Sequence, residues 1–287
     1  MDLLTPLLVA LAAGALPALY LYAASAAATR FPPLRNKRIC LLIAHPDDEA
    51  MFFGPTVVAL TRRETGNQVK ILCLSSGNAT GLGPTRKLEL LHSGALLGLR
   101  DPSDVFVVDQ PARFPDSMAA TWDASAIAGL LASAFAPPVP TIDVLVTFDG
   151  RGVSGHPNHI SLYHGARRFV ASLPPLLPPP AETSPVELYV LRSVGVARKY
   201  AGAADALVTT LLRWGAAGVE ELVFVSGWAA VRTGWRAMTQ AHRSQMVWFR
   251  WGWIALSRYM YVNDLRLDVV APERGPGWAR EEGKEAM

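Results

Sequence analysis

Residues 38–49 read Arg-Ile-Cys-Leu-Leu-Ile-Ala-His-Pro-Asp-Asp-Glu. The first six form an apolar run bounded by polar residues, which predicts a buried strand, and a helix is expected over 48–63. His45, Asp47 and Asp48 therefore fall where the strand ends, at the edge where open α/β sheets bind their ligands. Taken alone, the acidic residues are equally typical of a helix N-cap and of charges that suit the helix dipole.

A second polar cluster follows another apolar run, 142–146, and reads Thr-Phe-Asp-Gly-Arg-Gly-Val-Ser-Gly-His-Pro-Asn-His over 147–159. A helix is predicted over 157–171, because proline favours the first turn of a helix. Parallel strands bring their carboxyl ends to one edge of a sheet, so His156 and His159 are expected to meet the first cluster. Imidazole and carboxylate together suit a divalent metal, zinc foremost.

The remaining pattern alternates between strands and helices. Further strands are predicted over 68–74, 105–108, 186–190 and 222–225, and further helices over 85–97 and 121–135. Four such alternations indicate an α/β fold with a Rossmann-like, mainly parallel sheet and helices on both faces. Two segments fall outside this pattern, a proline-rich excursion over 173–185 and a polar tail over 273–287.

The amino terminus is apolar, with no charged residue between Leu3 and Thr29. This run exceeds the ~20 residues that a spanning helix needs, so we expect a transmembrane anchor over 1–29 and a single domain over 30–272. A cleaved signal peptide is the alternative, but its apolar core is usually only ~7–15 residues long and follows basic residues. Here the basic residues come after the run, which places the domain on the cytoplasmic side of a single-pass membrane protein.

Composition limits the function classes. With 51% hydrophobic residues, the 287-residue chain can bury a large core, and a net charge of +3 does not indicate a nucleic-acid-binding protein. Cys40 and Cys73 both lie in predicted buried strands, which is typical of reduced core cysteines. The aromatic stretch 246–262 predicts either a terminal helix packed on the sheet or a face at a membrane interface.

These motifs together resemble the LmbE-like deacetylase superfamily, and within it the membrane-anchored N-acetylglucosaminylphosphatidylinositol de-N-acetylases. The resemblance runs from about Arg38 to Leu265. Its motifs are Ala-His-Pro-Asp-Asp-Glu at 44–49, Ser-Ser-Gly-Asn at 75–78, Thr-Arg-Lys-Leu-Glu-Leu at 85–90, Gly-Val-Ser-Gly-His-Pro-Asn-His at 152–159, His-Arg-Ser-Gln at 242–245, and Trp-Phe-Arg-Trp with Ser-Arg-Tyr-Met near the end.

The resemblance implies a zinc-dependent hydrolase, although iron or manganese could occupy the same ligands. The metal would be held by His45, Asp48 and His159, with water in an open position. Asp47 would be the general base, and His156 would stabilise the oxyanion or protonate the leaving amine.

The resemblance also implies a glycolipid substrate, N-acetylglucosaminyl-phosphatidylinositol. Removal of acetate from this substrate would be an early step of GPI anchor synthesis at the endoplasmic reticulum membrane. Arg86 and Asn78 would contact this substrate. The alternative without a function for Arg86 is that it lies on an ordinary solvated helix face beside a flexible loop.

One position departs from the pattern of many soluble members, which have Asp where this chain has Asn158. In those proteins the carboxylate is thought to orient the neighbouring histidine. His156 is therefore expected to be a weaker base here, and Asp149 is a candidate for supplying the missing orientation.

Two other functions remain open. One is deacetylation of a soluble N-acetylglucosaminide, with the anchor serving only location. The other is a catalytically silent membrane scaffold, which would need neither Asp47 nor His156.

Overall fold

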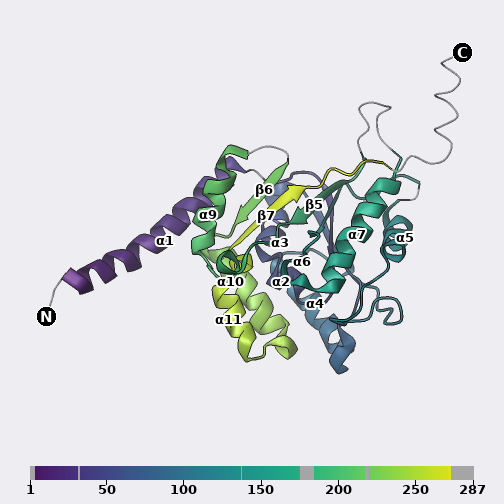
Figure 1. Ribbon diagram of the computed structural model, residues 1–287, viewed down its shortest axis with the longest axis horizontal. Coiled ribbons are helices and arrows are strands. Elements are labelled where there is room, and N and C mark those ends of the chain that lie inside the picture. Colours follow the sequence, from purple (N-terminus) through teal and green to yellow (C-terminus); the bar gives the residue numbers. More distant parts are fainter. Residues whose placement is uncertain (1–3, 32, 137, 175–183, 217–219, 273–287) are drawn as a thin grey trace, which may run out of the picture.

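The computed structural model describes residues 4–31, 33–136, 138–174, 184–216 and 220–272, and Figure 1 shows their arrangement. Seven strands form one sheet in the order β3-β2-β1-β4-β5-β7-β6. Their bounds are β1 Arg38–Ile43, β2 Gln68–Cys73, β3 Val105–Val107, β4 Val144–Phe148, β5 Glu187–Leu191, β6 Glu221–Val225 and β7 Val262–Leu267. The first five run parallel, whereas β7 pairs antiparallel with both β5 and β6.

The α-helices surround this sheet. Their bounds are α1 Leu4–Arg30, α2 Asp48–Met51, α3 Gly54–Leu60, α4 Gly83–Leu97, α5 Ala124–Phe135, α6 Gly152–Gly155, α7 Pro157–Ser172, α8 Val196–Lys199, α9 Ala204–Arg213, α10 Trp228–Arg236 and α11 Trp248–Leu256. α5 packs on α7, and α7 contacts β4 and β5, while α3 and α4 form a separate group with α10.

The chain changes direction at the centre of the sheet. From β1 it adds β2 and β3 on one side, and β4 and β5 extend the sheet on the other. Because parallel crossovers are nearly always right-handed, helices of the two halves cover opposite faces. The carboxyl ends of β1 and β4 therefore flank a topological switch point, where α/β proteins bind ligands.

The predicted α/β class is confirmed, with a mixed, mostly parallel sheet. The helix expected over 48–63 is broken into α2 and α3, since Pro55 in the first turn of α3 starts a new helix after Phe52 and Phe53. The strand β7 was not predicted, because its sequence, Val-Asn-Asp-Leu-Arg-Leu, has buried polar residues where a strand normally presents apolar ones.

The core lies around the central strands, where Cys40 and Cys73 are fully buried free thiols as predicted. α1 continues from the amino terminus to Arg30 and contacts α9 and β6. Across the described part of the chain, we find no helix whose length and apolar character suffice to span a bilayer. Most of the proline-rich excursion and all of the polar tail lie outside the described residues.

Candidate active site and metal centre

A cavity of about 820 Å³ opens at the switch point between β1 and β4. Its floor contains both predicted clusters: His45, Asp47 and Asp48 after β1, and His156 and His159 beside α7. The two sequence motifs, about a hundred residues apart, are therefore brought together as expected. The aromatic residues of α11 form the opposite wall of the cavity.

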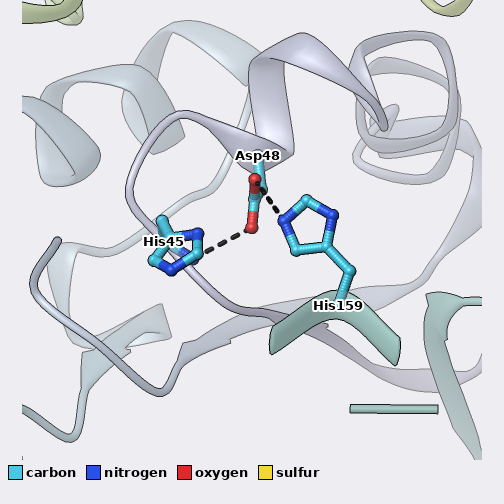
Figure 2. A group of neighbouring side chains, drawn as sticks. All are labelled: His45, Asp48 and His159. Atoms are coloured by element: carbon cyan, nitrogen blue, oxygen red, sulfur yellow. Dashed lines mark hydrogen bonds and ion pairs between the residues drawn. The ribbon is translucent and has the colours of Figure 1, made fainter. Parts of the chain in front are cut away.

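Asp48 is the centre of the buried group that Figure 2 shows, with His45 and His159 on either side of its carboxylate. Its Oδ2 accepts hydrogen bonds from the backbone N–H groups of Ala44 at 3.0 Å and of His45 at 2.9 Å. Its Oδ1 lies 3.3 Å from His159 Nε2. Burial alone would raise the pKa of Asp48, but the two imidazoles and these hydrogen bonds outweigh it, so the pKa lies below its ordinary value. Asp48 is thus ionised, as a metal ligand must be.

His159 is oriented so that one ring nitrogen faces the Asp48 carboxylate. Its Nδ1 lies 3.1 Å from the carbonyl oxygen of Gly152, which can only accept, so the neutral ring carries its proton on Nδ1. Its buried Nε2 faces Asp48 Oδ1 at 3.3 Å but makes no hydrogen bond to any described residue. The ring is stacked on Phe148 with centroids 4.0 Å apart, which fixes its plane. A carbonyl on one nitrogen and a lone pair on the other is the arrangement of a metal-binding histidine.

Ligand atoms of His45, Asp48 and His159 all lie within 4.8 Å of one another, so these residues fit a divalent metal. A second set, His45 with Asp116 and His156, meets the same criterion but is only partly buried. The first set suits a metal better because it is buried and contains the unpartnered His159 Nε2. His45 belongs to both sets, and its Nε2 lies 3.2 Å from Asp116 Oδ1.

Asp47 is held in an unusual backbone conformation, with φ at 116°, where non-glycine residues are rare. Strain of this kind persists where the surroundings fix it, as at functional sites. Its carboxylate is buried, 3.0 Å from Arg250 Nη2 and 3.6 Å from Arg86 Nη2. Two guanidinium groups therefore face the predicted general base.

His156 lies at the start of α7, where its Nδ1 accepts a hydrogen bond from the backbone N–H of Asn158 at 3.2 Å. In the neutral ring the proton is therefore on Nε2. Burial lowers the pKa of His156 to about 4, and the neighbouring His159 and His45 add to this effect. At neutral pH the side chain is an uncharged hydrogen-bond donor. The lowered pKa agrees in direction with the expected weaker base, and burial is its largest cause.

Two of the sequence-predicted residues do not lie as expected. Asp149 accepts hydrogen bonds from the backbone N–H of Ser193 at 2.8 Å, from its hydroxyl at 2.5 Å, and from the backbone N–H of Arg151 at 3.0 Å. These contacts pin the loop after β4 to β5, so Asp149 does not orient His156. Instead, the side chain of Asn158 contacts a predicted metal ligand, with its Oδ1 3.1 Å from His45 Nε2.

The predicted substrate-binding pair is also divided. Arg86 lines the cavity, but it is buried and donates to the carbonyl oxygens of Gly77 at 2.8 Å and Pro46 at 2.6 Å. It is therefore not on a solvated helix face. Asn78 is exposed and accepts from the N–H of Gly83 at 2.9 Å, capping the start of α4 outside the cavity lining.

Three functional residues were not identified from the sequence. Arg250 enters the cavity from α11 and belongs to the Trp-Phe-Arg-Trp motif, to which no role was assigned from the sequence. Asp116 enters from the long loop after β3, where no local pattern marks it. His242 is fully buried and donates to Glu49 Oε1 at 2.6 Å, and Ser93 Oγ donates to the same oxygen at 2.5 Å. Glu49 Oε2 accepts from the N–H of Asp47 at 3.2 Å, so the pair supports the strained base. The sequence offered one signal for this pair, because Glu49 belongs to the first motif and His242 to the His-Arg-Ser-Gln motif.

Comparison with known proteins agrees with this geometry. Residues 40–170 match the family described as PIG-L: GlcNAc-PI de-N-acetylase. The chain is 48% identical over 302 residues to the N-acetylglucosaminyl-phosphatidylinositol de-N-acetylase of Arthroderma benhamiae, covering 84% of this chain and 90% of that protein. It is 37% identical to the bovine (Bos taurus) protein of the same name, covering 81% of this chain and 84% of the relative.

Among solved structures, N,N'-diacetylchitobiose deacetylase from Pyrococcus horikoshii is similar in fold, with a TM-score of 0.52 at 16% identity, covering 81% of this chain and 84% of that one. At that identity the likeness concerns the fold alone. The identity to the fungal and bovine relatives extends over most of both chains. This chain therefore belongs to the N-acetylglucosaminyl-phosphatidylinositol de-N-acetylase family, within the LmbE-like superfamily.

Proposed function

We propose that the protein hydrolyses the acetamide of N-acetylglucosaminyl-phosphatidylinositol to an amine and acetate, a step of GPI anchor synthesis. One observation carries the proposal. A single cavity contains a buried His-Asp-His set, a strained carboxylate and a neutral imidazole donor, which are the groups that metal-assisted amide hydrolysis requires. The names of the full-length relatives supply the substrate.

His45, Asp48 and His159 would hold the metal, for which zinc is the leading candidate. When bound, such an ion lowers the pKa of a water molecule and polarises a carbonyl oxygen. Asp47 would accept the proton of the attacking water, because its carboxylate lies beside this set without being one of the metal ligands. Arg250 and Arg86 contact the carboxylate and fix its direction.

His156 would act through Nε2–H. Its lowered pKa keeps it neutral, so it donates a hydrogen bond to the carbonyl oxygen as negative charge develops there. The new C–O bond then replaces the C–N bond, and the proton collected by Asp47 passes to the leaving nitrogen. A base and a donor with separate duties complete the hydrolysis.

Membrane attachment is part of the proposal. The uncharged run before Arg30, followed by Arg35, Lys37 and Arg38, supports an anchor over 1–29 with the domain over 30–272 on the cytoplasmic face of the endoplasmic reticulum. Fractionation of a tagged chain tests this. We expect the tagged chain to stay in the membrane fraction after carbonate extraction, and we expect protease added outside intact microsomes to digest the domain. Release of the chain by carbonate would contradict the anchor.

Acetate release from purified protein in detergent tests the reaction. We expect release from N-acetylglucosaminyl-phosphatidylinositol that chelation abolishes and zinc restores, and slower release from water-soluble N-acetylglucosaminides. Faster turnover of a soluble substrate would move the function to that class. If folded, metal-loaded protein releases no acetate from the glycolipid or from any soluble N-acetylglucosaminide, the result would favour a catalytically silent membrane scaffold.

A further inference from the structure

A second cavity, of about 630 Å³, lies between α1, α9, α10 and α11. All of the described residues that line it are uncharged, and nearly all are apolar or aromatic, among them Leu21, Leu207, Trp228 and Leu256. Several are open to solvent, with Trp228 74% and Leu256 55% exposed. We call this cavity the apolar groove. An uncovered apolar groove of this size requires an occupant.

The apolar groove adjoins the catalytic cavity. Tyr200 and Leu256 line both. The ring of Tyr200 packs edge-on against Trp253, with centroids 6.0 Å apart, and Trp253 lines the catalytic cavity. Helix α11 therefore separates the two spaces, and a ligand that leaves the catalytic cavity along this helix enters the apolar groove directly.

A cationic group of the catalytic cavity lies on α11, the helix that also lines the apolar groove. Arg250 Nη2 contacts Asp47, but Nε and Nη1 are buried without hydrogen-bond partners among the described residues. Arg250 precedes Leu256 by six positions on α11, or about 9 Å at 1.5 Å per residue. The unused donors suit a phosphate oxygen.

These groups together match one kind of ligand. The catalytic cavity contains the amide site and has room for sugars, the Arg250 guanidinium lies beside Asp47 in the same cavity, and the hydrocarbon-lined groove adjoins it along α11. A glycosylated phosphatidylinositol has an acetamide, sugars, a phosphate and acyl chains, one group for each of these features. We propose that the apolar groove holds one acyl chain of the glycolipid substrate, with the phosphate against Arg250. This inference rests on the proposed function and names the part of the substrate that the groove binds.

Filling the groove tests the proposal. Ala204 and Ala255 are exposed on opposite walls, on α9 and α11, so Ala204→Trp and Ala255→Trp should each occupy the space of the chain. Displacing two methylene groups corresponds to roughly a tenfold loss of affinity. We therefore expect the ratio of kcat/KM on the diacyl substrate to kcat/KM on its deacylated headgroup to fall about tenfold or more. Ala134→Trp, on the exposed side of α5, is the matched control and should leave the ratio unchanged.

The outcomes separate the two proposals. If the wild type releases no acetate from either substrate, the proposed function fails. If it is active and the groove variants keep the ratio of the Ala134→Trp control, or lose both activities equally, the groove assignment is overturned and the function stands.

A direct readout avoids catalysis. N-acetylglucosaminyl-phosphatidylinositol with a diazirine at the end of one acyl chain should crosslink within 200–207 and 255–261, and phosphatidylcholine with the same diazirine should label these segments much less. Equal labelling by both lipids would assign the groove to bulk bilayer lipid. Labelling of neither segment would show that no acyl chain enters the groove, and either result overturns the proposal.

Discussion

Replacing Arg258 by Met tests the network that holds α9 and α11 on the sheet. Arg258 follows α11 and is fully buried. Its guanidinium contacts Asp205 in the first turn of α9, Asp264 Oδ1 of β7 at 2.9 Å, and Thr209 Oγ1 at 2.7 Å. Burial would lower its pKa, but the two carboxylates outweigh this and raise the pKa. The substitution keeps an unbranched apolar stem and removes the guanidinium with its charge and its donors.

Two routes give the magnitude. Breaking a buried ion pair from one side costs about 3–5 kcal/mol. Asp205 would keep Arg198 and Asp264 would keep Arg213 Nε at 3.3 Å, but both carboxylates would lose the fully buried guanidinium of Arg258. Counting hydrogen bonds to the two carboxylates at about 1.5–3 kcal/mol each gives about 3–6 kcal/mol. Both Asp205 and Asp264 are fully buried, so water cannot replace the lost donors. We expect Arg258→Met to lower the free energy of unfolding by about 3–5 kcal/mol.

Denaturant unfolding in detergent, followed by circular dichroism, measures this loss. Arg198→Met is the matched control, because Arg198 donates to the same Asp205 at 2.7 Å but its side chain is 29% exposed. About 1 kcal/mol is expected for the control. A loss below about 1 kcal/mol for Arg258→Met would refute the reasoning, since it would mean that the buried carboxylates do not depend on this residue.

Three further predictions concern the metal, the packing of the helices and the buried pair. His159→Ala should lose the bound metal, seen by elemental analysis of protein that keeps its circular dichroism, whereas full metal content would exclude His159 as a ligand. Gly165→Ala should cost about 1–3 kcal/mol, because its Cβ would lie 2.4 Å from Ile127, whereas Gly129→Ala meets nothing within 4 Å and should not destabilise. Burial would lower the pKa of His242, but Glu49 outweighs it and the pKa is raised. The stability that the His242–Glu49 pair adds is therefore complete below about pH 6.5 and is lost as the pH rises through the raised pKa of His242. The difference in Tm between the wild type and His242→Gln should shrink between about pH 6 and about pH 9, and a difference that grows over this range would contradict the prediction.

The parallel half of the fold was predictable because its strands are short apolar runs ending in polar loops. The runs before His45 and before Asp149 give β1 and β4, and adjacent parallel strands must deliver both loops to one edge. The strand β7 escaped prediction because Asn263 and Asp264 are buried inside it. Their burial depends on Thr56 and Arg258, distant in the chain, which no local pattern reveals.

The candidate site, too, has a part that could be predicted from the sequence and a part that could not. The ligand set was predictable because the two motifs each supply imidazole or carboxylate at a strand end. The orienting role given to Asp149 was wrong, since a carboxylate just after a strand is also well placed to fix the adjacent loop, here through Ser193. The contact of Arg250 with Asp47 joins residues about two hundred positions apart, so it can be seen only in the folded structure.

The central claim is that Asp47 is the general base beside a metal held by His45, Asp48 and His159. The most direct measurement is kcat for acetate release by Asp47→Asn at saturating N-acetylglucosaminyl-phosphatidylinositol, with metal content determined on the same sample. Asp123→Asn, which keeps an N-cap at α5 outside the cavity lining, is the control. We predict full metal content and a kcat lowered about 10²- to 10⁴-fold, the usual contribution of a general base. A kcat within about twofold of the wild type at full metal content would contradict the account.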